Sequence, residues 1–122
     1  MNNRKFWFSL MPKLFFWLTL SLVALLSLLA IPGKQVFQWQ DKLSHLVVYM
    51  LLFWLLLLAY GKQWSLISLG ILLVFFSGLI EVAQSFTGYR QAEWLDLLAN
   101  MVGILVAALS YKALKLYKNA NA

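Results

Sequence analysis

The sequence contains no cysteine, which excludes disulfide bonds and thiolate chemistry. Acidic residues are scarce too, with four among 122 residues, and charged residues of both signs make up only 11% of the chain. Soluble domains usually carry about 25% charged residues, so an ordinary water-exposed surface is excluded. With only two prolines, long apolar runs continue almost without interruption.

Hydrophobic residues make up 63% of the chain, and the mean hydropathy is +0.79. A single domain of this length has no interior large enough to bury so much apolar surface, so the sequence predicts an integral membrane protein. The net charge of +6 does not indicate a nucleic-acid partner. Most lysines and arginines lie at the ends of apolar runs, where they meet lipid headgroups.

The apolar runs predict an all-α fold with four transmembrane helices. The first run, residues 14–31, has no charge and would span roughly 27 Å as a helix. A signal peptide is the competing interpretation of this run, but its length and the spans that follow favour a helix. The other helices are expected at about 43–60, 65–84 and 93–114. The predicted organisation is a basic aromatic interfacial segment at 1–13, a four-helix transmembrane domain at 14–114 and a basic tail at 115–122.

The positive charges predict the orientation. If the N-terminus is cytoplasmic, the extracytoplasmic side holds Lys34, Lys42 and Arg90. The cytoplasmic side then holds Arg4, Lys5, Lys13, Lys62, Lys112, Lys115 and Lys118. By the positive-inside rule, we expect both termini in the cytoplasm.

This topology brings the strongly polar residues of the spans to one depth, within about two helical turns of the extracytoplasmic surface. They are Asp41, His45, Glu81, Gln84, Arg90, Asp96 and Asn100. Ionisable residues inside a membrane are costly and commonly mark function. We therefore predict a polar site at the extracytoplasmic face.

Helical spacing groups some of these residues. Asp41, His45 and Tyr49 are four residues apart and share a face, so Asp41 could fix the His45 tautomer. For this pair alone, the simpler interpretation is that Asp41 caps the helix and His45 lies among headgroups. Small residues also suggest that the helix carrying Glu81 packs against the row Ala99, Gly103 and Ala107.

The chemistry of the site stays open at this point. The Arg90 fork suits a phosphate or a carboxylate, and the carboxylates with His45 suit acid–base chemistry or a divalent metal. The alternative is structural: Arg90 pairs with Glu81 or Asp96, and the polar groups only hold the helices together. We favour a functional site, and we favour binding over catalysis because no nucleophile–base pair is evident.

Three separated motifs resemble the VanZ-like family. They are Asp-Lys-x-x-His-x-x-x-Tyr at 41–49, Gly-x-x-Glu-x-x-Gln at 78–84, and Arg90 followed by Asp96, Asn100 and Gly103. The loop has Thr-Gly-Tyr before Arg90, where the family commonly has proline.

The resemblance implies a multi-pass protein of the bacterial cytoplasmic (inner) membrane. The family's named member is linked to resistance to teicoplanin, a lipoglycopeptide aimed at a lipid-linked cell-wall precursor. The expected partners are membrane lipids, among them a phosphate-bearing lipid-linked precursor; no metal ion or cofactor is assigned. The site residues carried over by the resemblance are the same seven. Among them we expect acid–base roles for His45, Asp41 and Glu81, and ligand binding by Gln84, Arg90, Asp96 and Asn100.

Overall fold

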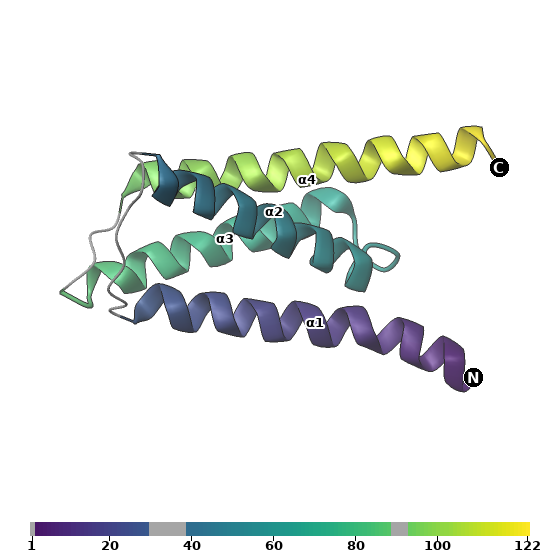
Figure 1. Ribbon diagram of the computed structural model, residues 1–122, viewed down its shortest axis with the longest axis horizontal. Helices are drawn as coiled ribbons and strands as arrows, with labels where there is room; N and C mark the ends of the chain where they lie inside the picture. The colour runs from purple at the N-terminus through teal and green to yellow at the C-terminus, as the bar shows by residue number, and fades with distance from the viewer. Residues whose placement is uncertain (1, 30–38, 89–92) are drawn as a thin grey trace.

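The structure, a computed structural model, describes residues 2–29, 39–88 and 93–122. Its elements are α1 (Asn3–Leu28), α2 (Gln40–Tyr60), α3 (Leu66–Ser85) and α4 (Trp94–Ala120), with no strand in these three ranges. The helices run alternately up and down the bundle, and both ends of the chain lie at the same end (Figure 1). All four are long and apolar enough to cross a membrane. The predicted all-α fold with four spans is confirmed.

The first and last helices are longer than predicted. The first begins at Asn3, where the Asn2 side chain accepts a hydrogen bond from the Arg4 backbone N–H, and it continues through Pro12 into the apolar run. The last continues to Ala120 because nothing after Leu114 breaks a helix, and its lysines and alanines are good helix formers. A helix of 26 residues is about 39 Å long, which exceeds the roughly 30 Å of hydrocarbon in a bilayer.

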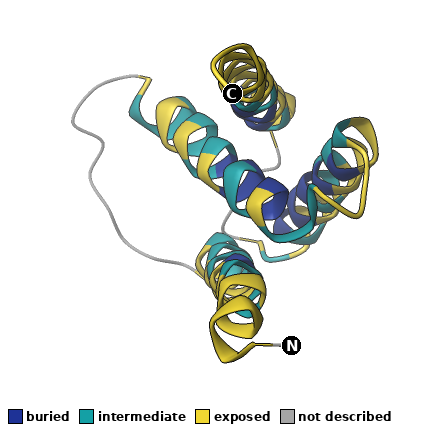
Figure 2. Cartoon of the chain, turned by 90° about the vertical axis from the view of Figure 1, so that its right-hand side faces the viewer, coloured by how far each residue is buried: buried dark blue, intermediate teal, exposed yellow. Residues whose placement is uncertain are grey.

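The core is centred on α2 (Figure 2). Leu52 and Phe53 on this helix are at most 1% exposed, and they pack with buried side chains of α3 and α4. Within the described part of α1, only Phe16 is buried. Helix α1 packs mainly on α2 but contributes only this one buried side chain, so most of its described surface faces outward.

Gly103 shows why α4 packs mainly on α2. A Cβ atom at Gly103 would overlap the carbonyl oxygen of Leu46 on α2 and would lie 3.1 Å from the Met50 nitrogen. The expectation that the small-residue row of α4 meets α3 is therefore wrong. Glycine lets two backbones touch, and α2 is the helix that makes this approach. At Gly78 on α3, a Cβ atom would meet no heavy atom of the described chain within 4 Å.

The alternation of the helices brings the start of α2, the end of α3 and the start of α4 to one end of the bundle (Figure 1). The termini lie at the opposite end. Polar residues at these three helix ends can therefore meet although those of α2 are about 40 to 55 positions from the others in the sequence.

Candidate functional site

All four acidic residues of the chain lie at this end, and Lys42 joins three of them. Its Nζ atom lies 3.3 Å from Asp41 Oδ2 and 2.7 Å from Glu93 Oε2, and it also contacts Asp96 Oδ1. The Asp96 side chain is 9% exposed, whereas that of Glu93 is half exposed. Lys42 therefore links the first turn of α2 to the first turn of α4.

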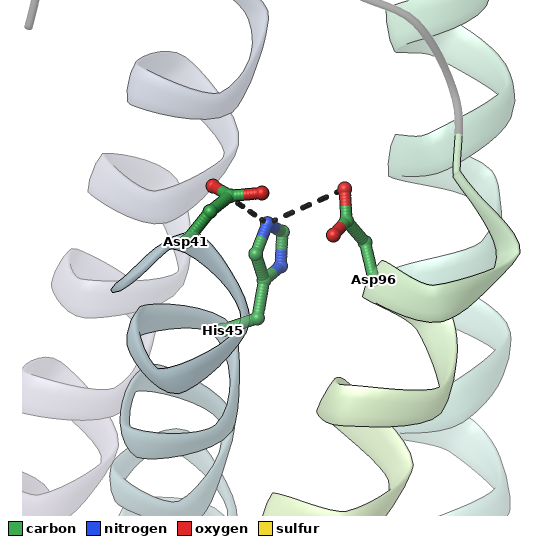
Figure 3. A group of neighbouring side chains, drawn as sticks. All are labelled: Asp41, His45 and Asp96. Carbon is green, nitrogen blue, oxygen red and sulfur yellow. Dashed lines mark ion pairs between the residues drawn. The ribbon is translucent and has the colours of Figure 1, made fainter. Parts of the chain in front are cut away.

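His45 lies between Asp41 and Asp96 (Figure 3). Its Nε2 atom is 3.9 Å from Asp41 Oδ1 and 3.7 Å from Asp96 Oδ2. These distances suit an ion pair but are too long for hydrogen bonds. Each aspartate thus turns one oxygen toward Lys42 and the other toward His45.

Asn100 holds the other side of the imidazole. Its Oδ1 atom lies 3.0 Å from His45 Nδ1, and the residue is 1% exposed. An amide oxygen only accepts hydrogen bonds, so Nδ1 carries the proton in this arrangement. In the neutral ring, Nε2 is then the unprotonated nitrogen, and it faces the two carboxylates.

Asp41 does not cap α2, contrary to the simpler interpretation of the sequence. The N-cap position is Trp39, which makes no side-chain capping bond, and Asp41 lies in the first helical turn. Its carboxylate is engaged by Lys42 and His45 instead.

Glu81 approaches the same group from α3. It is 7% exposed and lies within electrostatic range of Asp96, His45 and Lys42. The Glu93 backbone N–H donates a hydrogen bond to its carboxylate. Its Oε2 atom is buried and has no hydrogen-bond partner among the residues that the structure describes. A buried carboxylate oxygen without a partner is unusual and calls for a compensating group.

We call Asp41, Lys42, His45, Asp96 and Asn100 the polar cluster, with Glu81 beside it and Glu93 at its outer rim. Five of the seven residues singled out in the sequence are thus brought together: Asp41, His45, Glu81, Asp96 and Asn100.

The other two of the seven residues are Gln84 and Arg90. Gln84 is buried, but its Nε2 donates to the Ser27 carbonyl of α1 at 2.8 Å, so it connects α3 to α1. Arg90 lies outside the described residues, and its predicted role stays a prediction.

The site residues predicted from the sequence include neither Lys42 nor Glu93, which pairs with Lys42 at the exposed rim. Lys42 stands in the motif Asp-Lys-x-x-His, where it was counted only for the orientation of the chain. One signal for Lys42 was available in the sequence. The chain has only four acidic residues, so a lysine next to one of them, Asp41, is a strong candidate for an ion pair. Glu93 was treated as a helix start, and indeed it occupies the N-cap position of α4.

A cavity of about 200 Å³ lies beside the polar cluster, between α1 and α2. Asp41, Ser44 and His45 contribute its polar wall, and Tyr49 and apolar side chains of α1 close it. Three larger cavities, of about 330, 540 and 700 Å³, have almost wholly apolar walls, and Lys42 borders the first of them. The small cavity is lined by His45 itself and offers a polar ligand a route to it.

The arrangement can bind a cation between carboxylates, accept hydrogen bonds from hydroxyl or amine groups, and transfer a proton through His45.

Comparison with known proteins places the chain in a family. The model of the VanZ/LLP1 family matches residues 3–115. No curated protein and no solved structure matches the chain. Since the family model covers nearly the whole chain and agrees with the motif resemblance, the protein belongs to the VanZ/LLP1 family.

Proposed function

We propose that this VanZ/LLP1-family protein binds an anionic lipid-linked component of the cell envelope at the extracytoplasmic end of its helix bundle. The observation that carries the proposal is the convergence of buried polar groups from three helices on one end, beside a cavity that opens next to α1. Polar groups at membrane depth are costly, so their gathering at one end favours a site for a polar headgroup.

The distribution of charge supports the orientation. Seven of the ten lysines and arginines belong to the first half of α1, the turn between α2 and α3, and the end of α4, all away from the polar cluster. The positive-inside rule puts that basic end in the cytoplasm, with both termini. We place the protein in the bacterial inner membrane on this basis together with the family.

The proposed ligand is a headgroup that combines phosphate with hydroxyl or amine donors. Carboxylates and the Asn100 amide can accept hydrogen bonds from the donors, and Lys42 with Arg90 can supply positive charge for the phosphate. The proposal includes the family's link with teicoplanin resistance. A protein that binds a lipid-linked cell-wall precursor would change the access of the antibiotic to that precursor.

A structural role is the second candidate, and one observation favours it. Two ion pairs of Lys42, with Glu93 and Asp96, tie α2 to α4 without any ligand. In that case the polar cluster serves only to hold the helices in register, and removal of a member lowers stability without affecting any bound lipid.

Native mass spectrometry of the purified protein tests the proposal. We expect wild type to retain a discrete phosphate-bearing lipid, and we expect Asp96→Asn and Arg90→Ala to lose it. Lys62→Gln, a charge removal in the turn at the opposite end, is the control and should retain the lipid. Equal retention by folded wild type, Asp96→Asn and Arg90→Ala would contradict the proposal, as would loss of lipid only from variants that have unfolded.

A further inference from the structure

We infer that the polar cluster holds a divalent metal ion, of the Zn²⁺ or Mn²⁺ type, bound by Asp41, His45 and Asp96. This goes beyond the proposed function, because a cation site at these residues does not depend on which headgroup the protein binds.

The first argument is the geometry of the donor atoms. One ligand atom from each of the three residues lies within 4.8 Å of the others, and two helices supply them (Figure 3). Metal–ligand bonds of about 2.0–2.2 Å place neighbouring ligands roughly 3.3–3.6 Å apart in a tetrahedral site. The His45 Nε2 atom is 3.7 Å from the Asp96 oxygen and 3.9 Å from the Asp41 oxygen, so small side-chain rotations bring all three to bonding distance.

The second argument is the way in which neighbouring groups orient these donors. Asn100 accepts from His45 Nδ1–H and thereby directs the Nε2 lone pair at the gap between the carboxylates. A histidine that binds a metal almost always donates its other N–H in this manner. Lys42 holds one oxygen of each aspartate, so the other oxygen of each points at the same gap.

The third argument is electrostatic. In the neutral ring, an unprotonated nitrogen faces two carboxylate oxygens at distances too long for hydrogen bonds. Lys42 offsets the charge on one oxygen of each aspartate, and a metal ion in the gap would offset the charge on the other two oxygens.

Glu81, which also lies within electrostatic range of Lys42, brings a further buried carboxylate to this group. It is 7% exposed, lies within electrostatic range of His45 and Asp96, and its Oε2 atom has no hydrogen-bond partner in the described parts of the chain. Leaving a buried carboxylate uncompensated is strongly unfavourable. A divalent ion next to Asp96 would offset this charge as well as those of the two aspartates.

The donor set determines the class of metal. One imidazole nitrogen with two carboxylate oxygens is intermediate between the all-oxygen sites of Mg²⁺ and Ca²⁺ and the sulfur-rich sites of structural zinc. Zn²⁺ and Mn²⁺ both accept such mixed sets. The adjacent cavity of about 200 Å³ leaves room for water or a ligand oxygen to complete the coordination.

The test measures metal binding directly. The full-length protein in detergent is stripped with EDTA, titrated with Zn²⁺ or Mn²⁺, and analysed for bound metal by elemental mass spectrometry and for affinity by calorimetry. We expect one ion per chain in wild type, and at least a tenfold weaker affinity in His45→Gln and Asp96→Asn. Absence of stoichiometric metal in wild type would overturn the inference.

Glu93→Gln is the matched control, because it removes the same charge as Asp96→Asn from the exposed rim without removing a proposed ligand. It should keep one ion per chain with an affinity within threefold of wild type. If Glu93→Gln and Asp96→Asn weaken binding equally, the metal responds to overall negative charge and the inference fails. A metal-dependent rise in the melting temperature of wild type, absent in His45→Gln, is the second readout. Lipid retention is measured separately, so failure of the metal site and failure of the proposed function are distinguishable.

Discussion

His45 on α2 and Asn100 on α4 are joined side chain to side chain across 55 positions of the sequence, with 3.0 Å between His45 Nδ1 and Asn100 Oδ1. The amide is almost completely buried, so the pair forms away from water. It fixes the ring of the only histidine in the chain and aligns the second turns of the two helices that pack most extensively.

Asn100→Leu should destabilise the protein, because the His45 Nδ1–H loses its acceptor while remaining buried. An unsatisfied buried donor costs about 1–3 kcal/mol. Thermal unfolding in detergent, compared with Ser44→Ala, measures the effect. Ser44 bonds only to its own helix at an exposed position and should melt like wild type. An unchanged melting temperature for Asn100→Leu would mean that the His45–Asn100 bond contributes nothing.

Gly103→Ala should lower stability by about 1–3 kcal/mol, as overpacking does in tightly packed interiors. The added methyl group overlaps the Leu46 carbonyl, so α2 and α4 must separate. Gly78→Ala is the matched control, since its methyl group meets no described atom within 4 Å and alanine is the better helix former. Gly78→Ala should melt at or above the wild-type temperature. Equal behaviour of the two variants would argue against the close approach of α2 and α4.

Lys42→Met should be destabilising by at least about 2 kcal/mol, because it leaves the nearly buried Asp96 carboxylate without its cation. The double variant Lys42→Met with Asp96→Asn should recover part of this loss, since the buried charge is then removed as well. Chemical or thermal unfolding of the two single variants and the double variant gives the coupling between them. Strictly additive effects would show that the ion pair carries no net energy.

Glu81→Gln should stabilise the metal-free protein, because glutamine keeps the shape and the bond from the Glu93 backbone while removing an uncompensated buried charge. The measurement is the melting temperature in EDTA, with Gln84→Glu as the reverse change at a neighbouring buried position on the same helix. Gln84→Glu should destabilise, since it removes the donor to the Ser27 carbonyl. A lower melting temperature for Glu81→Gln would mean that the carboxylate is already compensated.

Much of this arrangement follows from the sequence because membrane depth is a strong constraint. Apolar run length fixes the number of spans, and alternation of direction then brings Asp41, Glu81 and Asp96 to one end without any knowledge of packing. Helical spacing likewise predicted that Asp41 and His45 share a face, as the structure shows.

The side-chain contacts depend on how each helix is rotated and on which helix it packs against. Apolar periodicity does not determine either, because lipid and protein interior are equally apolar. The row ending at Ala107 therefore fits α2 as well as α3, and only the contact at Gly103 distinguishes them. The same uncertainty hid the partner of Asp96, which is Lys42 on α2. Gln84 was placed at the right depth but faces α1.

The single buried side chain within the described part of α1 has an evolutionary consequence. Selection for packing constrains Phe16 and the positions beside it, while most of the helix needs only to stay apolar. Homologous sequences should therefore drift fastest along α1 and slowest along α2. The rate of substitution in each of the four helices should then fall as the number of its buried side chains rises.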